Sequence, residues 1–297
     1  MKKIKIIANP VSGREEALQK VMHLVKFLSK DQVEITLLFT HGTDDATRYA
    51  QQDHGEDLVI ACGGDGTLHE VVNGLYYAKR RKPLAILPCG TVNDFANHLK
   101  LPHNVRRFYQ MLLKGNTMDI DLGMAGERVF VNVAAGGHLT EIAYSVSDDT
   151  KAKFGNMAYY FEGAKELLKL RPFGQTDLIK LYVESEELQG EEEVLVFIIA
   201  NSASVGGFKK LAPRAEVFDG YLDVLMLKEL EPLDVPELIA SLLNGNHVDH
   251  NKIIYIKTKE IQIKSDRQVN LDLDGERAGE LPMTFKVLEK ALTLIVN

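Results

Sequence analysis

An aspartate enclosed by three glycines is the first feature of this sequence that could do chemistry. The stretch Gly63-Gly64-Asp65-Gly66 follows the apolar run 58–62, whose β-branched residues predict a buried strand. Thr67, with Glu70 three residues later, predicts a capped helix directly after it. A tight turn from a strand into a helix presents backbone N–H groups at a positive helix end, which suits phosphate. Asp65 could bind the Mg²⁺ that accompanies a phosphate. The alternative is an ordinary glycine-rich turn.

Two further loops of this kind stand where predicted strands end. Apolar runs predict strands, and helical spacing predicts helices, over 3–8, 15–29, 33–39, 44–52, 58–62, 84–87, 92–99 and 104–113. Strands that alternate with helices predict a parallel sheet covered on both faces. Ligands bind such sheets beyond the carboxyl ends of the strands, where the loops 9–13, 63–67 and 90–94 all meet. This coincidence favours the nucleotide site over the ordinary turn.

The pattern changes at about residue 126 to mostly β segments. Strands are predicted over 178–184, 194–200, 221–227, 253–257, 260–264 and 268–273, and helices at 158–170 and 233–243. The glutamate-rich segment 185–193 is interpreted as a solvated hairpin tip, because blocks of like charge mostly stay in water. Two terminal strands are predicted at 285–288 and 292–296. We expect an α/β domain over 1–125, joined by the C-terminal strands of 283–297, and a β-sandwich-like domain over 126–282.

Carboxylates at two predicted turns could serve phosphoryl transfer. Asp274-Gly275-Glu276 follows an alternating strand that would place Asp272 and Asp274 on one face, and Asp-Gly is first of all a hairpin signal. The functional interpretation makes Glu276 a general base for a hydroxyl that attacks a γ-phosphoryl group. The segment 216–223 offers oxygen ligands around a second glycine turn, which suits Mg²⁺ but is also common in ordinary turns.

Composition and absent motifs exclude several classes of protein. The 297 residues are 45% apolar and 26% charged, as in a globular protein of about two domains. The net charge of −7 (35 − 42) argues against broad nucleic-acid binding, which needs a basic surface. The sequence shows no signal peptide and no run near the ~20 apolar residues of a membrane span, so a cytoplasmic location is expected. It lacks the P-loop, dinucleotide-binding, nucleophile-elbow and protein-kinase motifs.

Six motifs in order resemble those of one family. They are Asn9-Pro10-Val11-Ser12-Gly13, the stretch 63–70, the stretch 90–96, Asp121-Leu122-Gly123, Asp219-Gly220-Tyr221-Leu222-Asp223 and Asp274-Gly275-Glu276. Together they resemble the bacterial diacylglycerol kinase-like lipid kinases, in the superfamily shared with NAD kinases. The resemblance runs the whole length of the chain. One departure is His69, which stands where asparagine is more frequent.

The resemblance implies a fold and a set of site residues. The fold is an N-terminal three-layer α/β nucleotide-binding domain with a parallel sheet and a C-terminal β-sandwich-like domain, with the active site in the cleft between them. Glu276 would be the proton acceptor, and Asp65, Asp94 and Asp121 would form a carboxylate and metal network. A structural Mg²⁺ would be held by Asp219 with oxygens from Glu216 and Tyr221. The implied ATP contacts are Asn9, Ser12, Gly13, Thr40, Gly63, Gly64, Asp65, Gly66, Thr67, Leu68, His69, Glu70 and Thr91.

The implied activity is ATP- and Mg²⁺-dependent phosphorylation of a lipid hydroxyl, with diacylglycerol converted to phosphatidic acid. Phosphatidylglycerol, a sphingoid base and a polyprenol remain open as acceptors. An NAD kinase is the alternative enzyme, and a weak nucleotide- or lipid-binding regulator is the alternative without catalysis. A lipid substrate requires peripheral, reversible membrane contact, for which the basic and aromatic segment 151–171 is a candidate. A homodimer is compatible with the sequence, and no nucleic-acid partner is expected.

Overall fold

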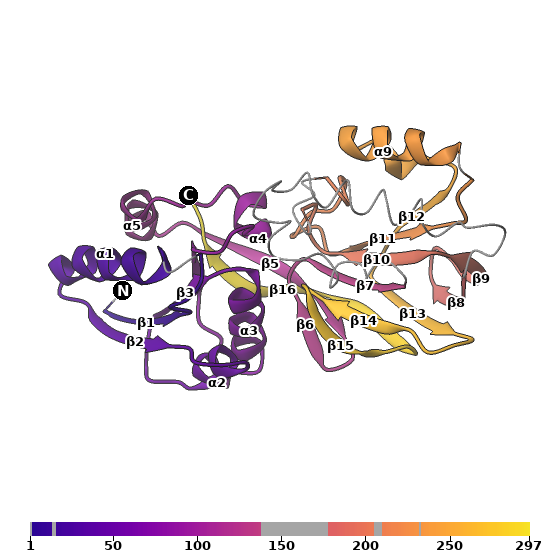
Figure 1. Cartoon of the computed structure of the whole chain (residues 1–297). Helices are drawn as coiled ribbons and strands as arrows, with labels where there is room; N and C mark the ends of the chain where they lie inside the picture. The colour runs from indigo at the N-terminus through magenta and orange to yellow at the C-terminus, as the bar shows by residue number, and fades with distance from the viewer. Residues whose placement is uncertain (1, 14–15, 138–177, 205–209, 232) are drawn as a thin grey trace.

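A computed structural model of the chain describes residues 2–13, 16–137, 178–204, 210–231 and 233–297, which form two sheets with helices around them (Figure 1). The first sheet contains β1 Lys3–Ala8, β2 Glu34–Phe39, β3 Leu58–Gly63, β4 Leu84–Pro88, β5 Thr117–Ala125, β6 Arg128–Phe130, β8 Ile179–Ser185, β9 Gln189–Val194, β13 Glu260–Ser265 and β16 Met283–Ile295. The second contains β7 Val133–Gly137, β10 Val196–Ala200, β11 Leu222–Leu227, β12 Ile253–Thr258, β14 Asn270–Leu273 and β15 Glu276–Glu280. The α-helices are α1 Glu16–Leu28, α2 Asp45–Gln51, α3 Asp65–Tyr76, α4 Asp94–His98, α5 Val105–Lys114 and α9 Asp234–Asn244.

The N-terminal part has the three layers that the sequence predicts. Strand β1 pairs in parallel with β2 and β3, and β3 pairs in parallel with β4. Helices α1 and α5 lie on one side of these strands, and α2 and α3 lie on the other (Figure 1). Strands β1 and β3 are almost wholly buried, because a parallel sheet covered on both faces needs apolar residues on both. The carboxyl ends of β1, β3 and β4 therefore open toward one edge.

The second sheet packs on the C-terminal half of the first and forms a sandwich. The order of the second sheet is β12-β11-β10-β7-β14-β15, and its pairs are antiparallel. Its inner residues share one core with those of β8, β13 and β16. Phe197 of β10 and Phe285 of β16 meet edge to face across this core, with ring centroids 6.4 Å apart. The predicted α/β and β-sandwich-like fold class is confirmed.

One long strand replaces the two terminal strands that the sequence predicts. Strand β16 pairs antiparallel with β5 along both halves, and the register shifts between Leu288 and Leu292. It pairs with β13 near its start and in parallel with β4 near its end. The first sheet therefore runs without a break from the α/β part into the sandwich, in the order β2-β1-β3-β4-β16-β13-β8-β9. The exact division of the chain into domains stays a prediction.

The interpretation of segment 185–193 as a hairpin tip holds only for its first half. Glu186 and Glu187 lie in the turn between β8 and β9, whereas Glu191, Glu192 and Glu193 lie in β9, which pairs antiparallel with β8. Strand β10, predicted as the partner of β8, instead lies in the second sheet between β11 and β7. The predicted helix 158–170 and the basic and aromatic segment 151–171 lie outside the described residues.

Candidate active site

Glycines bring three predicted loops into contact at the carboxyl ends of β1, β3 and β4. A Cβ on Gly64 would lie 3.3 Å from the Gly90 Cα and 3.7 Å from the Ser12 Oγ. Gly13 has a φ of +60°, and a Cβ there would overlap the backbone carbonyl of Cys89. The overlap at Gly13 excludes a side chain and the contact at Gly64 is already tight, so the glycines let the loops 9–13, 63–66 and 89–93 form one surface. The structure thus brings together Ser12, Gly13 and the glycine loop, as the sequence predicts.

Helix α3 begins two residues before its predicted cap. Gly64 is the N-cap in an extended conformation, with no side-chain capping bond, and Asp65 is in the first turn. Thr67 is buried against Gly63. The Glu70 carboxylate instead accepts the N–H of Ala46 at 3.0 Å, in the first turn of α2. The predicted capping box is therefore wrong, and no side chain caps the start of α3 at Gly64.

Asp65 and Asp94 form a strained pair of carboxylates at this edge. Burial, followed by the charge of Asp94, raises the pKa of Asp65 to about 6. Asp94 opens α4 and accepts the Ser204 hydroxyl at 3.0 Å. Two desolvated carboxylates that repel each other form a donor set that a divalent cation would neutralise. By their chemistry these two residues fit Mg²⁺.

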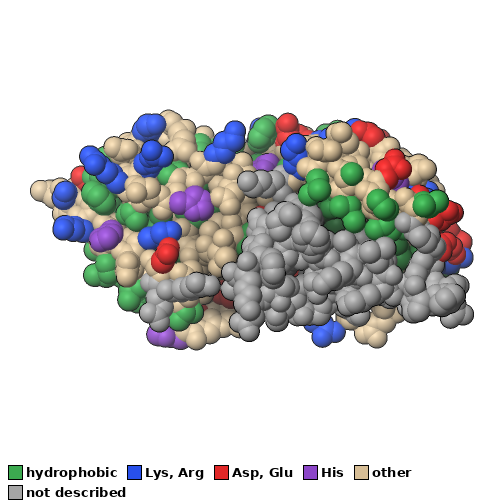
Figure 2. Space-filling view, turned by 45° about the horizontal axis from the view of Figure 1, so that its top comes forward, with side chains coloured by type: hydrophobic (Ala, Val, Ile, Leu, Met, Phe, Trp, Pro, Cys, Tyr) green, Lys and Arg blue, Asp and Glu red, His purple; other side chains and the backbone are tan. Residues whose placement is uncertain are grey.

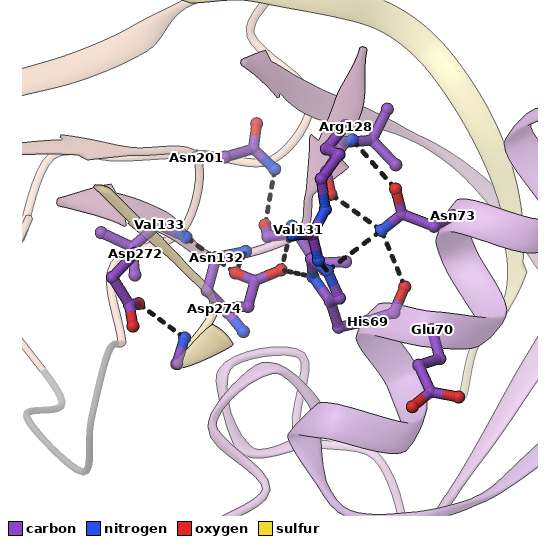
Figure 3. Close-up of polar contacts among 12 residues, drawn as sticks. His69, Glu70, Asn73, Arg128, Val131, Asn132, Val133, Asn201, Asp272 and Asp274 are labelled. Carbon is purple, nitrogen blue, oxygen red and sulfur yellow. Dashed lines mark hydrogen bonds and ion pairs between the residues drawn. The ribbon is translucent and has the colours of Figure 1, made fainter. Parts of the chain in front are cut away.

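The turn after β14 carries Glu276 to the start of α3. A Cβ on Gly66 would lie 3.5 Å from the Glu276 Oε1, so this carboxylate sits over the glycine loop. Asp274 is buried and points the other way, into a cluster with His69 and the backbone of 131–133 (Figure 3). Asp272 points away from that cluster and accepts the Gly275 N–H at 2.7 Å. The expected shared face of Asp272 and Asp274 is wrong, because Asp274 (φ 54°) has left the strand conformation.

The Asp121 carboxylate, expected in the metal network, is hydrogen-bonded to backbone N–H groups. It is 1% exposed, and its oxygens accept the N–H groups of Gly220 and Lys290, each at 2.7 Å. Its carboxylate thereby ties β5 to the turn 219–220 and to β16. This geometry favours a structural role over direct contact with a metal.

The turn implied to hold a structural Mg²⁺ is already in contact with the positively charged side chain of Lys257. One Asp219 oxygen accepts the Tyr221 N–H at 3.0 Å, and the other contacts the Lys257 ammonium. Glu216 is exposed nearby. These oxygen donors suit a hard cation, but Mg²⁺ at Asp219 would have to displace Lys257. Within the described ranges, no three His, Cys, Asp or Glu side chains group to hold a metal ion.

The remaining implied ATP contacts are spread more widely. Asn9 caps its own loop by accepting the Val11 N–H at 3.2 Å, and Thr91 is exposed at the third loop. Thr40 follows β2, with its N–H bonded to Ala8 at 2.9 Å. Leu68 is in the hydrophobic core of the α/β part, and the His69 side chain is committed to Asp274. Leu68 and His69 therefore offer no free side chain to a nucleotide.

Sequence reasoning missed a polar chain that the sandwich contributes to the site. Ser202 donates to Asn132 at 2.8 Å, and Ser204 reaches Asp94. Asn201 donates to the carbonyls of Asp121 and Val131 at 3.0 and 2.8 Å. The available signal was the run Asn201-Ser202-Ala203-Ser204 directly after an apolar strand, where a loop at a sheet end gathers polar side chains.

Comparisons with known proteins show which proteins the chain is similar to. A family model described as the diacylglycerol kinase catalytic domain matches residues 3–125, and one described as the YegS C-terminal NAD kinase beta sandwich-like domain matches residues 132–296. A diacylglycerol kinase from Bacillus subtilis (strain 168) is 36% identical over 302 aligned residues, covering 100% of this chain and 97% of its own. One from Staphylococcus carnosus (strain TM300) is 33% identical, covering 97% of this chain and 93% of its own. A crystal structure from Bacillus anthracis str. Sterne, provisionally named a diacylglycerol kinase, aligns with a TM-score of 0.84 and 26% identity over 100% of this chain and 95% of its own.

Proposed function

Because the chain belongs to the diacylglycerol kinase family and is a lipid kinase, we propose that it transfers the γ-phosphoryl group of ATP to the free hydroxyl of diacylglycerol. The observation that carries the proposal is the position of Glu276 over the glycine loop, beside the start of α3. The proposed base, on a turn of the second sheet, thereby faces the start of α3, which would bind phosphate and belongs to the α/β part. Relatives named diacylglycerol kinase support this acceptor.

Residues of both parts of the chain would take part in phosphoryl transfer. The N–H groups at the start of α3 and the loops around Ser12 and Gly90 would hold the phosphates. Glu276 would take the proton of the lipid hydroxyl as its oxygen bonds to the γ-phosphorus. The bond between that phosphorus and the β,γ-bridging oxygen breaks, and ADP leaves with the electron pair. Phosphatidic acid is the other product.

Asp65 and Asp94 would hold the Mg²⁺ that arrives with ATP. When bound, such a cation neutralises charge on the phosphates. The site at Asp219, with Glu216 and Tyr221, remains a second proposed position, and it depends on release of Lys257 from Asp219.

Label transfer from γ-labelled ATP tests the activity. The protein is given Mg²⁺ and mixed micelles of each candidate lipid, and NAD in a separate reaction. Label in diacylglycerol would confirm the proposal, and label in another lipid would identify another acceptor. Label only in NAD would identify the chain as an NAD kinase. ATP binding without any transfer would support the regulator.

Glu276→Gln tests the base. Loss of the carboxylate should lower turnover about 10²–10⁴-fold with ATP binding kept. Glu280→Gln on the same strand is the matched control and should keep full turnover. Turnover of Glu276→Gln close to that of the control would refute the role.

We also infer reversible contact with anionic membranes, which a lipid acceptor requires. Among the described residues, no helix is long and apolar enough to cross a membrane. Lys and Arg side chains gather over the end that contains α1 and α5, and Asp and Glu gather at the opposite end (Figure 2). The exposed cations of these helices include Lys26, Arg106, Arg107 and Lys114. Each could contribute about 1 kcal/mol near an anionic surface.

Sedimentation with anionic vesicles tests this surface. Joint replacement of Arg106 and Arg107 by glutamate should weaken binding about tenfold or more. Replacement of the exposed Lys264 by glutamate is the control. Equal binding by both variants would refute the proposal that the cations of α1 and α5 contact the membrane. Whether the enzyme is a homodimer stays a prediction.

A further inference from the structure

One buried cluster joins the glycine-loop helix to the turn that carries Glu276. His69 of α3 and Asp274 of the turn have side chains only 3% and 1% exposed, and His69 Nδ1 lies 2.9 Å from Asp274 Oδ2 (Figure 3). The two residues are 205 positions apart in the chain and come from opposite sides of the site. The contact therefore links the helix that would hold phosphate to the segment that would hold the base.

The Asp274 carboxylate fixes its own turn as well. Its Oδ2 accepts the Val131 N–H at 2.7 Å, and its Oδ1 accepts the N–H groups of Asn132 and Val133 at 2.8 and 3.0 Å. Its own N–H donates to the Val133 carbonyl at 2.9 Å. Glu276 follows two residues later, so the bonds of Asp274 restrict the position of the Glu276 backbone.

The surroundings of His69 select one form of its ring. Both groups that face Nε2 are hydrogen-bond donors, namely the Arg128 Nη2 at 3.2 Å and the Asn73 Nδ2 at 3.3 Å. Nε2 must therefore be the acceptor, and the ring proton must be on Nδ1, where it meets Asp274. Arg128 also donates to the Arg277 carbonyl at 3.0 Å, directly after Glu276. The same guanidinium thus orients the ring and holds the start of β15.

We propose that His69 is a positioning residue for phosphoryl transfer, and that its neutral Nδ1–H form, oriented by Arg128 and bonded to Asp274, sets the position of Glu276 over the start of α3. This inference rests on the proposed role of Glu276 as the base. His69 itself touches no reacting atom, since its ring is buried and both its nitrogens are engaged within the protein. Its effect should appear in turnover and not in affinity for ATP.

Two replacements of similar size separate this role from simple packing. The amide nitrogen of an asparagine falls near the position of Nδ1, and that of a glutamine falls near the position of Nε2. His69→Asn can therefore still donate to Asp274, whereas His69→Gln directs its donor toward the Arg128 guanidinium. A side chain needed only to fill space would tolerate glutamine at least as well as the smaller asparagine.

The experiment measures kcat and the KM for ATP of both variants, at a temperature at which each is shown to be folded. His69→Gln should lose about 10–100-fold in kcat with the KM for ATP within about threefold of wild type, because a small displacement of a catalytic group has effects of that size. His69→Asn should keep kcat within about threefold. Full activity of His69→Gln, or equal loss in both variants, would overturn the proposal.

A ¹⁵N spectrum of the histidine-labelled holo chain tests the bond without activity. The signal that disappears in His69→Asn should carry its proton on Nδ1 and none on Nε2. A proton on Nε2 would overturn the assignment even in an active enzyme. A wild type that phosphorylates no lipid would refute the proposed function instead, and the spectrum would still decide the His69–Asp274 bond.

Discussion

Replacing Asp274 by asparagine should destabilise the protein strongly, although it changes one atom. The carboxylate accepts four donors, three from backbone and one from His69. An asparagine has one oxygen for them, and its NH₂ group faces two donors in either orientation. With His69 and Val131 on one oxygen and Asn132 and Val133 on the other, two donors lose their acceptor whichever way the amide turns.

The magnitude follows from these two lost bonds. A hydrogen bond to a charged group contributes about 1.5–3 kcal/mol, and a buried donor without a partner adds to the loss, so we expect about 3–5 kcal/mol. For a chain of this size that lowers the thermal midpoint by about 6–15 °C. Thermal unfolding followed by circular dichroism measures it.

The neighbouring Asp272 supplies the control for this experiment. Asp272→Asn changes the same functional group in the same turn, where the bond to the Gly275 N–H can be kept by the amide oxygen. Its thermal midpoint should shift by no more than about 2–4 °C. If Asp274→Asn unfolds within that range as well, Asp274 does not anchor the turn, and the reasoning from its four donors is refuted.

Three other changes test separate parts of the structure. Lys5→Met should cost about 3–5 kcal/mol because it leaves Glu56 buried without its 2.6 Å partner, whereas Lys3→Met at an exposed pair should cost under about 1 kcal/mol in the same urea titration. Since the folded pKa of Asp65 (about 6) lies above its ordinary 3.8, ionisation opposes folding most fully above pH 6, and this penalty fades toward pH 4. Asp65→Asn should therefore stabilise the nucleotide-free protein by about 1–3 kcal/mol at pH 7.5, seen as a higher thermal midpoint, and by less at pH 5. An equal gain at both pH values would contradict this. Mg²⁺ alone should raise the thermal midpoint of Lys257→Met more than that of wild type, because the ammonium no longer competes for Asp219; equal responses would argue against a cation there.

The sequence predicts those parts of the fold that repeat a simple pattern. Alternating apolar runs and helical periods locate β1, β3, β4 and the helices beside them to within a few residues. The three glycine loops are predictable for the same reason, since they end neighbouring parallel strands. These features depend on local patterns and on one general rule about sheet edges.

Features that depend on the position of an element in the fold were not predictable in this way. Strand β9 is rich in glutamate, which does not favour a strand, but it pairs with β8 at the edge of the first sheet, where charged side chains face water and Glu191 pairs with Lys180 at 2.6 Å. Strand β16 looks like two strands because its register shifts beside β5. Ser204 reaches Asp94 across 110 residues, which no spacing in the chain reveals.

The site aspartates show most clearly what only the structure can separate. Asp121 and Asp274 are surrounded by N–H donors, so their negative charge is stabilised by the backbone and serves to join segments. Asp65 also accepts the backbone N–H groups of Asp94 and Phe95, but burial and the charge of Asp94 outweigh these bonds and raise its pKa, so its negative charge is destabilised in the ligand-free fold. The sequence alone does not separate these aspartates by role, because each stands in a predicted motif near a glycine. Replacement by asparagine should therefore lower the stability of the protein at Asp121 and Asp274 but raise that of the ligand-free protein at Asp65. This opposite sign of the stability change distinguishes a structural carboxylate from one that would bind a ligand.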